Sequence, residues 1–457
     1  MIQVHDPANG DLLGEIGSGG PAEADAAVRR ARAASEGWRR TAPAERAAAL
    51  SAAAAALEAR ADEVAELQTR ENGKPLGDSR GGVAAGIGTL REYAALGPLH
   101  RGESLAGGWD ALDLALREPR GVAVALVPWN DPVAIACGPI GACLVAGNAL
   151  VLKPSEKTPL SSALMAEILS AHLPDDVLVL AEGDGEMGRA LVAHPGVDIV
   201  LHTGSVSTGR EVAAACGAHL RKAVLELGGK DPLIVDAGVD PAWAAAQAAS
   251  GAFANAGQVC TSVERIYVHE RIAERFLEAL VAEARALVPG HGLDPRSTLG
   301  PLIDAGQHTV VDAHVQRARA DGARLLHGGE RLPGAGWFYA PTVLADVPDD
   351  TPLMRDETFG PVAAVRAVGD FDEALARAGG GEHGLAATVL TPSQRNALRA
   401  VRELPVGTVK VNAVWGGAPG GSAEPCGDSG LGTGYGPHLL DEVTRLKVAH
   451  YAPAPWA

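Results

Sequence analysis

The strongest constraint on the fold is an alternation of apolar strands with helices that appears twice along the 457-residue chain. Between residues 121 and 216, short apolar runs such as GVAVALVP alternate with stretches in which apolar residues recur at helical spacing. The same rhythm starts again after residue 230. Strands that alternate with helices form parallel sheets with helices on both faces. The sequence therefore predicts an α/β fold built on parallel strands.

The remaining segments predict smaller structures around this framework. Residues 1–20 carry turn signals typical of a short hairpin, and residues 21–68 predict two or three helices with a break at 41–43. A further helix is expected over 78–96. Residues 103–119 alternate apolar and polar side chains, which indicates strands that lie outside the main sheet.

The charge of the chain excludes some classes of function. Its formal net charge of −17 argues against binding to nucleic acid or to an anionic membrane surface. The most apolar region, residues 122–152, is interrupted by prolines and polar residues and is a poor membrane span. The N-terminus lacks the basic start and the apolar run of a targeting signal. We therefore expect a cytoplasmic protein that contacts neither nucleic acid nor membrane.

The cysteines and histidines predict neither disulfides nor a metal site. The five cysteines are widely spaced and contain no Cys-x-x-Cys pair, and the histidines are scattered without metal-binding spacing. Only Cys260 has a setting that suggests reactivity. The other four are expected to be packing residues, namely Cys137, Cys143, Cys216 and Cys426.

A thiol and a carboxylate, Cys260 and Glu226, lie 34 residues apart in similar apolar and glycine-rich settings. A thiolate is the best side-chain nucleophile for a carbonyl near neutral pH, and a helix end or nearby N–H groups would lower the pKa of Cys260. Glu226 lies between two leucines, where burial raises the pKa of a carboxylate into the range that suits a general base. Each could equally be an ordinary residue, a packing cysteine or an exposed strand glutamate.

Polar residues also follow two of the predicted strands. Asn130 comes after the apolar run GVAVALV, and its amide could donate a hydrogen bond to a developing oxyanion. Lys153 and Glu156 follow the next strand and could bracket a ribose, since both can bond its hydroxyl groups. Glu156 would then disfavour a 2′-phosphate by charge repulsion. Each segment could also be an ordinary polar turn.

Two further segments suggest where a nucleotide would lie. Gly204 and Ser205 stand between a strand and a helix, where glycine and hydroxyl groups form pyrophosphate sites. The segment is not the G-x-G-x-x-G fingerprint and is a weak signal alone. Glu357 and Phe359 place a carboxylate beside a ring that could hold a ribose and a nicotinamide face. Read alone, this segment is also typical of a turn.

Together these segments resemble the NAD(P)-dependent aldehyde dehydrogenase superfamily. The motifs occur in family order over essentially the whole chain: ENGKP, PWN-x-P, AGNALVLKPSE-x-TPL, TGS-x-x-x-G, LELGGK, GQVC and E-x-FGPV. The resemblance implies a Rossmann-type NAD(P)-binding domain from residues 1–102 and 120–227 and an α/β catalytic domain from 228–425. It also implies a β-rich oligomerisation arm from 103–119 and 440–457, and hence a homodimer or homotetramer.

The resemblance implies a role for each motif residue. Cys260 would attack the aldehyde, Asn130 would hold the oxyanion, and Glu226 would activate the water that hydrolyses a thioester to a carboxylic acid. The residues implied to bind the cofactor, NAD with NADP as the alternative, are Trp129, Lys153, Ser155, Glu156, Gly204, Ser205, Leu227, Gly228, Glu357 and Phe359.

The chain departs from the family pattern at three places. Asp131 stands where an aromatic residue usually follows the asparagine, which suggests either a pocket for a polar or cationic aldehyde or a solvent-facing turn. The segment 425–430 looks shortened, and the arginine and glutamate that often follow are replaced around Thr433 and Gly434. Because that glutamate can assist water relay in relatives, the hydrolytic step could be altered here.

Two alternatives remain open within this fold. An acylating enzyme would pass the thioester to coenzyme A or phosphate, although such relatives usually lack a glutamate at the position of Glu226. A scaffold or binding protein that has lost activity is the second alternative. The late departures favour it, and the intact Cys260, Glu226 and Asn130 oppose it.

Overall fold

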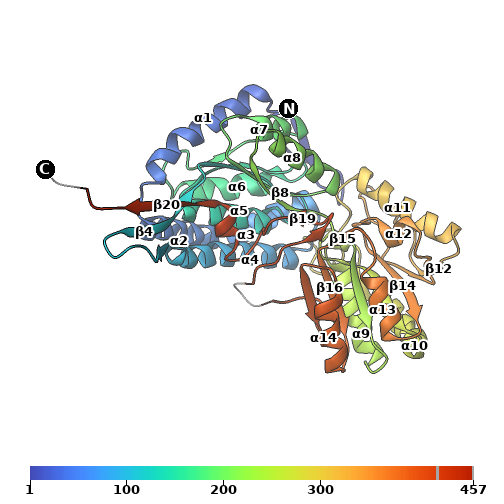
Figure 1. Ribbon diagram of the computed structural model, residues 1–457. Coiled ribbons are helices and arrows are strands. Elements are labelled where there is room, and N and C mark those ends of the chain that lie inside the picture. The colour runs from blue at the N-terminus through green and yellow to red at the C-terminus, as the bar shows by residue number, and fades with distance from the viewer. Residues whose placement is uncertain (418–420, 455–457) are drawn as a thin grey trace.

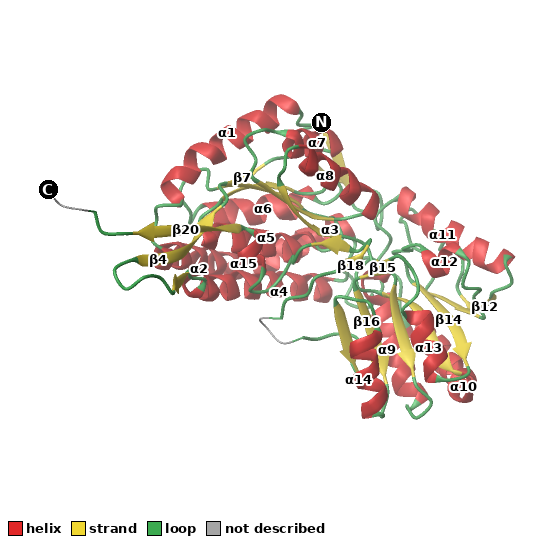
Figure 2. Ribbon diagram, in the orientation of Figure 1, coloured by secondary structure: helices red, strands yellow, loops and turns green. Residues whose placement is uncertain are grey.

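The computed structural model describes residues 1–417 and 421–454 and contains two large sheets, each covered by helices (Figure 1). A smaller sheet of three strands projects from the side of the first large sheet (Figure 2). The predicted α/β fold with parallel sheets is confirmed, because most neighbouring strands of both large sheets run parallel.

The first large sheet has six strands in the order β19-β9-β8-β5-β6-β7. All neighbours are parallel except β19, which returns from the C-terminal part of the chain and runs antiparallel to β9. The strands are β5 (Val122–Leu126), β6 (Ala149–Lys153), β7 (Leu178–Leu180), β8 (Ile199–Thr203), β9 (Lys222–Glu226) and β19 (Gly430–Leu431).

Helices cover both faces of this sheet because alternate residues of its strands enter different cores. Val122 and Val124 of β5 pack with α1, α7 and α8, whereas Ala123 and Ala125 pack with α2 to α6. A strand buried on both faces reads as a continuous apolar run, as β5 does. The helices are α1 (Pro21–Trp38), α2 (Pro43–Ala59), α3 (Ala61–Asn72), α4 (Leu76–Leu96), α5 (Pro132–Ala146), α6 (Pro159–Ser170), α7 (Gly185–Ala193) and α8 (Val206–Ala218).

The second large sheet has seven strands in the order β12-β13-β14-β11-β10-β16-β17, parallel except for β12. Leu233 and Val235 of β10 pack with α9 and α10, and Ile234 packs with α11 to α14. The strands are β10 (Asp231–Val235), β11 (Val263–His269), β12 (Arg324–His327), β13 (Thr342–Ala345), β14 (Val362–Val368), β16 (Ala386–Leu390) and β17 (Thr408–Val411). The helices are α9 (Pro241–Phe253), α10 (Glu270–Ala286), α11 (Ala305–Ala320), α12 (Pro352–Arg355), α13 (Phe371–Ala378) and α14 (Gln394–Glu403).

The projecting sheet joins two distant parts of the chain. β20 (Thr444–Tyr451) runs antiparallel to β4 (Leu112–Pro119), and β3 (Glu103–Leu105) pairs with the other edge of β4. The predicted strands at 103–119 therefore lie outside both large sheets. The remaining elements are the hairpin β1 (Ile2–His5) and β2 (Leu12–Ile16), the pair β15 (His383–Gly384) and β18 (Cys426–Gly427), α15 (Leu439–Glu442), and short 3-10 turns at Gly97–Leu99 and Ala254–Gly257.

The segments around the large sheets agree with the sequence predictions, with one notable omission. The N-terminal hairpin, the helix break at 41–43 and the helix predicted over 78–96 are all present. α7 was not predicted, because its sequence GEMGRALVA is short and contains two glycines. The division into three functional parts stays a prediction. None of the helices within the described ranges is both long and apolar enough to cross a membrane.

One buried carboxylate fixes the start of α6 against α3. Glu71 Oε2 accepts a hydrogen bond from Leu160 N at 2.8 Å, and Oε1 accepts one from Ser161 N at 3.0 Å. The side chain is fully buried, and burial raises the pKa of Glu71 to about 7. The glutamate of the ENGKP motif is therefore a structural residue that caps the amino end of a neighbouring helix.

We expect Glu71→Ala to lower the free energy of unfolding, because it leaves the N–H groups of Leu160 and Ser161 without their acceptor. The expected loss is about 2–3 kcal/mol, typical of buried donors left unpaired. The midpoint of urea unfolding measures it. Glu66→Ala, on the exposed face of the same helix, is the matched control. Equal midpoints for the two variants would contradict the capping role.

Candidate active site

The predicted catalytic residues come together where the carboxyl edge of the first large sheet faces the amino edge of the second. Asn130 follows β5, Glu226 ends β9, and Cys260 precedes β11. All three line one cavity of about 190 Å³. Seven predicted cofactor residues line the same cavity, namely Trp129, Gly204, Ser205, Leu227, Gly228, Glu357 and Phe359.

The loop that carries Cys260 is held in an unusual backbone conformation. Asn255 and Ala256 adopt left-handed φ values of 50° and 54°, and Gly257 follows with a φ of 73°. A Cβ on Gly257 would overlap the carbonyl of Gly360, so only glycine fits there. Gln258 anchors the loop, since its Nε2 donates to Pro301 O at 3.2 Å. This strained turn presents the thiol at the sheet edge.

Hydrogen bonds from two asparagines fix Asn130 beside that loop. Asn72 Nδ2 and Asn255 Nδ2 each donate to Asn130 O at 3.2 Å. Asn130 Nδ2 in turn donates to Gln258 O at 3.1 Å. Asn130 is 6 % exposed, so its amide is a rigid donor that keeps its second N–H for a ligand in the cavity.

Glu226 is held by the backbone of the C-terminal segment. Its Oε1 accepts a hydrogen bond from Gly434 N at 2.9 Å. Burial raises the pKa of Glu226 to about 7, and the Gly434 N–H opposes part of that rise. The expected raised pKa is confirmed, and it places this carboxylate in the range of a general base at neutral pH.

The expectation of a lowered pKa for Cys260 is wrong. Burial raises the pKa of the Cys260 thiol to about 12, and the neighbouring carboxyl groups of Asp231, Glu357 and Glu226 add to the rise. The neighbouring ionisable groups that act on the thiol are carboxyl groups, whose charge is opposite to that which stabilises a thiolate. Without a ligand, the thiol rests protonated and needs a base to accept its proton.

A buried ion pair, which the sequence analysis missed, supports the segment that carries Glu357 and Phe359. Glu264 accepts hydrogen bonds from Thr358 N and Phe359 N, both at 2.8 Å, and pairs with Lys230. Lys230 Nζ also donates to Thr358 Oγ1 at 3.1 Å. A glutamate inside a strand gave no sequence signal, although Lys230 lies within the LELGGK motif. Breaking such a pair leaves an uncompensated buried charge.

Glu357 and an aromatic pair close the cavity on the cofactor side. Glu357 Oε1 accepts a hydrogen bond from Gly229 N at 3.3 Å, and burial with the nearby Glu264 charge raises the pKa of Glu357 to about 8. The rings of Phe359 and Trp129 pack edge to face at 5.3 Å. This wall is largely apolar and carries one hydrogen-bonding carboxyl group.

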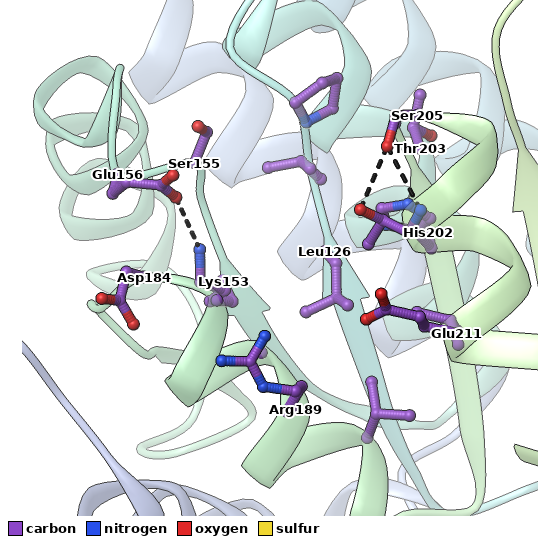
Figure 3. Close-up of a pocket in the computed structure, with 18 of the residues that line it drawn as sticks. Leu126, Lys153, Ser155, Glu156, Asp184, Arg189, His202, Thr203, Ser205 and Glu211 are labelled. Atoms are coloured by element: carbon purple, nitrogen blue, oxygen red, sulfur yellow. Dashed lines mark hydrogen bonds and ion pairs between the residues drawn. The ribbon is translucent and has the colours of Figure 1, made fainter. Parts of the chain in front are cut away.

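A larger cleft of about 540 Å³ continues from this cavity across the carboxyl ends of β5, β6 and β8 (Figure 3). The two share Pro128, Trp129, Thr203, Gly204 and Ser205. The cleft also receives the other three predicted cofactor residues, Lys153, Ser155 and Glu156. All of the predicted site residues except Asp131 thus line one continuous space.

The cleft has the features that a dinucleotide needs. Ser205 caps α8, whose amino end opens into the cleft beside Gly204. A Cβ built on Gly204 would lie 2.7 Å from the ring of His202, so a larger residue there would force that ring to move. An apolar slot between α7 and α8 suits a flat base and is lined by Val192, Ala193, Val212 and Ala215. The residues present therefore fit an adenine dinucleotide.

Asp131 lies outside both the cavity and the cleft. Its Oδ2 is 3.0 Å from Lys74 Nζ, and its Oδ1 accepts a hydrogen bond from Gln68 Nε2 at 3.2 Å. The Asp131 side chain is 27 % exposed, and that of Lys74 is 6 % exposed. The negative charge is therefore balanced inside the protein, and Asp131 braces the segment that carries Asn130.

The predicted packing role holds for three of the four other cysteines. Cys137, Cys143 and Cys216 are buried, and Cys426 is exposed, which corrects the prediction for that residue. Cys426 lies in the two-residue strand β18, which leaves its side chain uncovered. Among the residues that the structure describes, no three His, Cys, Asp or Glu side chains are grouped to hold a metal ion.

Comparison with known proteins decides the family. The model of the aldehyde dehydrogenase family matches residues 1–449. The chain belongs to the aldehyde dehydrogenase family. An NAD-dependent aldehyde dehydrogenase from Sinorhizobium meliloti is 34% identical with a TM-score of 0.96, over 100% of this chain and 92% of that chain.

Two further solved structures have the same TM-score of 0.96. An indole-3-acetaldehyde dehydrogenase from P. syringae, solved with NAD+ and IAA, is 35% identical over 99% of this chain and 93% of that chain. An NADP-dependent enzyme from E. coli is 32% identical over 99% of this chain and 95% of that chain.

The late segment of this aldehyde dehydrogenase folds back onto Glu226. β19 pairs Gly430 with Glu226, and the chain then passes Gly434 to Tyr435, whose ring lies close to Gly138 of α5. A Cβ on Gly434 would overlap the Glu226 side chain. Gly434, one of the departures from the family pattern, is thus the residue that gives Glu226 its present position.

We expect alkylation of Cys260 by iodoacetamide in the cofactor-free enzyme to accelerate with pH well beyond pH 9, because the thiol has a raised pKa and only the thiolate reacts. A Cys426→Ala background removes the exposed competing thiol. The rate of loss of free thiol measures the reaction, with Cys260→Ala in that background as the blank. A rate that levels off near pH 7 would contradict the raised pKa.

Proposed function

We propose that this chain oxidises an aldehyde to a carboxylic acid with NAD as the acceptor, through a covalent intermediate on Cys260. One observation carries the proposal: the thiol of Cys260, the amide of Asn130 and the carboxyl group of Glu226 line one cavity that opens into a dinucleotide-sized cleft. A nucleophile, an oxyanion donor and a base with a pKa near 7 are the groups that this chemistry requires.

In the first half of the reaction, the Cys260 sulfur adds to the aldehyde carbonyl. The thiol proton passes to the Glu226 carboxylate, since the raised pKa of Cys260 requires a base. The Asn130 side-chain N–H stabilises the oxyanion of the resulting thiohemiacetal. Bound NAD supplies the hydride acceptor. Loss of hydride from the thiohemiacetal carbon leaves a thioester on Cys260.

In the second half, Glu226 removes a proton from water, and the hydroxide oxygen attacks the thioester carbonyl. Glu226 must first release the proton that it took from the thiol. The tetrahedral oxyanion again faces Asn130, and its collapse breaks the carbon–sulfur bond. The products are a carboxylic acid and free Cys260.

The cofactor is assigned to the cleft by the groups that line it. Lys153 and Glu156 would hold the adenosine ribose, and the amino end of α8 at Gly204 and Ser205 would hold the pyrophosphate. Glu357 would hold the nicotinamide ribose. The nicotinamide would lie against Trp129, Leu227, Gly228 and Phe359, which line the cavity beside Cys260.

The environment of Asp131 bears on the substrate class. Because Lys74 already balances its charge at 3.0 Å, Asp131 offers a cationic aldehyde no unpaired carboxylate. We therefore infer that amino aldehydes gain no preference from this residue. A higher kcat/KM for amino aldehydes than for neutral ones of equal length would contradict the inference.

Two other functions are distinguished by their products. An acylating enzyme would release an acyl-coenzyme A or an acyl phosphate, so product analysis with and without these acceptors separates it from hydrolysis. The position of Glu226 next to Cys260 favours hydrolysis. A scaffold that has lost activity would bind NAD and reduce none of it with any aldehyde.

The first test is NADH formation with a panel of aliphatic, aromatic, acidic and amino aldehydes. We expect turnover with at least one class and none with Cys260→Ala, which should still bind NAD because the thiol is outside the adenosine cleft. Normal turnover of Cys260→Ala would refute the covalent mechanism. NAD binding without reduction across the whole panel would favour the scaffold.

We expect the hydrolytic step to speed up as pH rises through about 7, because Glu226 acts as a base only when it is deprotonated and its pKa is about 7. Glu226→Gln removes this base and should slow turnover by about 100-fold or more, the usual range for a general base. The stopped-flow burst of NADH should slow as well, because Glu226 also accepts the Cys260 proton in the first half of the reaction. A burst at the wild-type rate would contradict that role and leave Glu226 as the base of hydrolysis alone.

We propose that the projecting sheet is the arm that joins subunits, with residues 103–119 and 440–457 as its parts, of which 455–457 lie outside the described residues. The large domains would be a cofactor part at 1–102 and 120–227 and a catalytic part at 228–425. β20 is an edge strand whose Leu446 and Val448 are 59 % and 66 % exposed. An uncovered apolar edge of this kind marks an interface.

The double variant Leu446→Glu and Val448→Glu should therefore reduce the molar mass in solution to that of one chain, because it places charges in the interface. Light scattering coupled to size exclusion measures the mass. Leu12→Glu, at an exposed leucine of the N-terminal hairpin, is the control and should keep the wild-type mass. An unchanged mass for the double variant would contradict the proposed arm.

A further inference from the structure

An arginine that the sequence analysis did not single out points into the nucleotide cleft. Arg189 lies on α7, and its guanidinium faces the open space between Lys153 and Glu211 (Figure 3). Within residues 1–417 and 421–454, no hydrogen bond or ion pair ends on Arg189. By contrast, Arg30 and Arg32 of the neighbouring α1 pair with Asp176 and Asp198.

The backbone of α7 aims this guanidinium at the ribose end of the cleft. A Cβ built on Gly188 would lie 3.9 Å from Lys153 Cδ, so this turn of α7 packs against the lysine. Arg189 Nη1 lies 3.4 Å from a Cβ built on Gly185, so the side chain folds back towards the amino end of α7. Arg189 and Lys153 therefore lie on the same side of the cleft, where β6 ends.

The carboxylates around this position are largely engaged. Glu156 Oε2 is 3.5 Å from Lys153 Nζ, which balances the charge that would repel a phosphate. Asp184 caps α7 and accepts a hydrogen bond from Glu186 N at 2.8 Å. Glu211 lies on the opposite wall, on α8 (Figure 3). Arg189 thus adds a positive charge that no carboxylate pairs with, beside a glutamate that is already paired.

We infer that Arg189 binds the 2′-phosphate of NADP, so that this enzyme accepts NADP as well as NAD. The inference rests on the proposed function, which assigns the cleft to the cofactor. A planar guanidinium binds phosphate oxygens in a bidentate way, and an arginine close to the ribose is the usual means of accepting a 2′-phosphate. Lys153 supplies a second cation, and the Ser155 hydroxyl lies in the same lining.

The arrangement of Lys153, Glu156 and Arg189 is also compatible with the binding of NAD. Glu156 can accept a hydrogen bond from a free 2′-hydroxyl while Lys153 stays beside it. Arg189 is exposed at the cleft wall and can remain hydrated when no phosphate is present. The residue therefore adds affinity for the phosphorylated ribose alone. A substitution should change the ratio of the two affinities rather than both together.

The test compares two fragments by isothermal titration calorimetry, which needs no catalysis. Adenosine 2′,5′-bisphosphate carries the 2′-phosphate, and 5′-AMP lacks it. We expect Arg189→Met to weaken the binding of the bisphosphate by about tenfold or more, which is the range for loss of a charge-assisted phosphate contact. The binding of 5′-AMP should weaken by less than about twofold. Arg29→Met, at an exposed arginine on α1, should change neither. Glu156→Gln should strengthen the binding of the bisphosphate, because it removes the carboxylate that repels a phosphate.

The outcomes separate this inference from the cofactor assignment. Equal weakening of both fragments by Arg189→Met would place the arginine on their shared part and overturn the inference. Unchanged affinities for both fragments in Arg189→Met would also overturn it. So would a wild-type enzyme that binds 5′-AMP but does not bind the bisphosphate. Failure of the wild type to bind either fragment, or NAD itself, would instead refute the proposed cofactor site.

Discussion

The site depends on one geometric constraint, which is that parallel strands end together. β5, β6, β8 and β9 all finish at one edge of the first sheet, so the residues that follow them meet in space. The amino edge of the second sheet faces this edge and contributes the residues that precede its strands. Residues more than 100 positions apart, such as Asn130 and Cys260, therefore meet without any direct sequence relation.

Burial controls the charge state of this meeting point. Cys260, Glu226 and Glu357 all have raised pKa values, with burial as the largest cause for each. The ligand-free site therefore favours protonated groups near neutral pH, which avoids the cost of several uncompensated negative charges in a small cavity. The Glu264 carboxylate is engaged differently, because Lys230 and two backbone N–H groups share it. The Glu264–Lys230 pair therefore holds the segment that carries Glu357 and Phe359, while Cys260 and Glu226 are available for proton transfer.

The sequence predicted the parts of the site that lie next to strong strand signals. Asn130, Lys153 and Glu226 follow or end continuous apolar runs, so their place at a sheet edge could be expected. Arg189 could not be found in this way, because α7 has a weak helical signal and the arginine is distant from any motif. Glu264 was hidden for another reason: a charged residue inside a buried strand is read as solvent-facing unless its partner, Lys230, is known. The pKa of Cys260 depends first on burial and then on three carboxyl groups, and only the fold determines both.

Burial raises the pKa of Glu226 to about 7, and the backbone N–H of Gly434 limits that rise. Without a side chain at this position, the carboxylate of Glu226 can approach the backbone and accept the Gly434 N–H at 2.9 Å. That hydrogen bond favours the ionised form and opposes the larger effect of burial. Because a Cβ would overlap Glu226, any other residue there would displace the carboxylate from this N–H. In the proposed mechanism, a backbone dipole therefore takes the supporting position beside the base, and the glycine is part of the catalytic geometry rather than a loss of it.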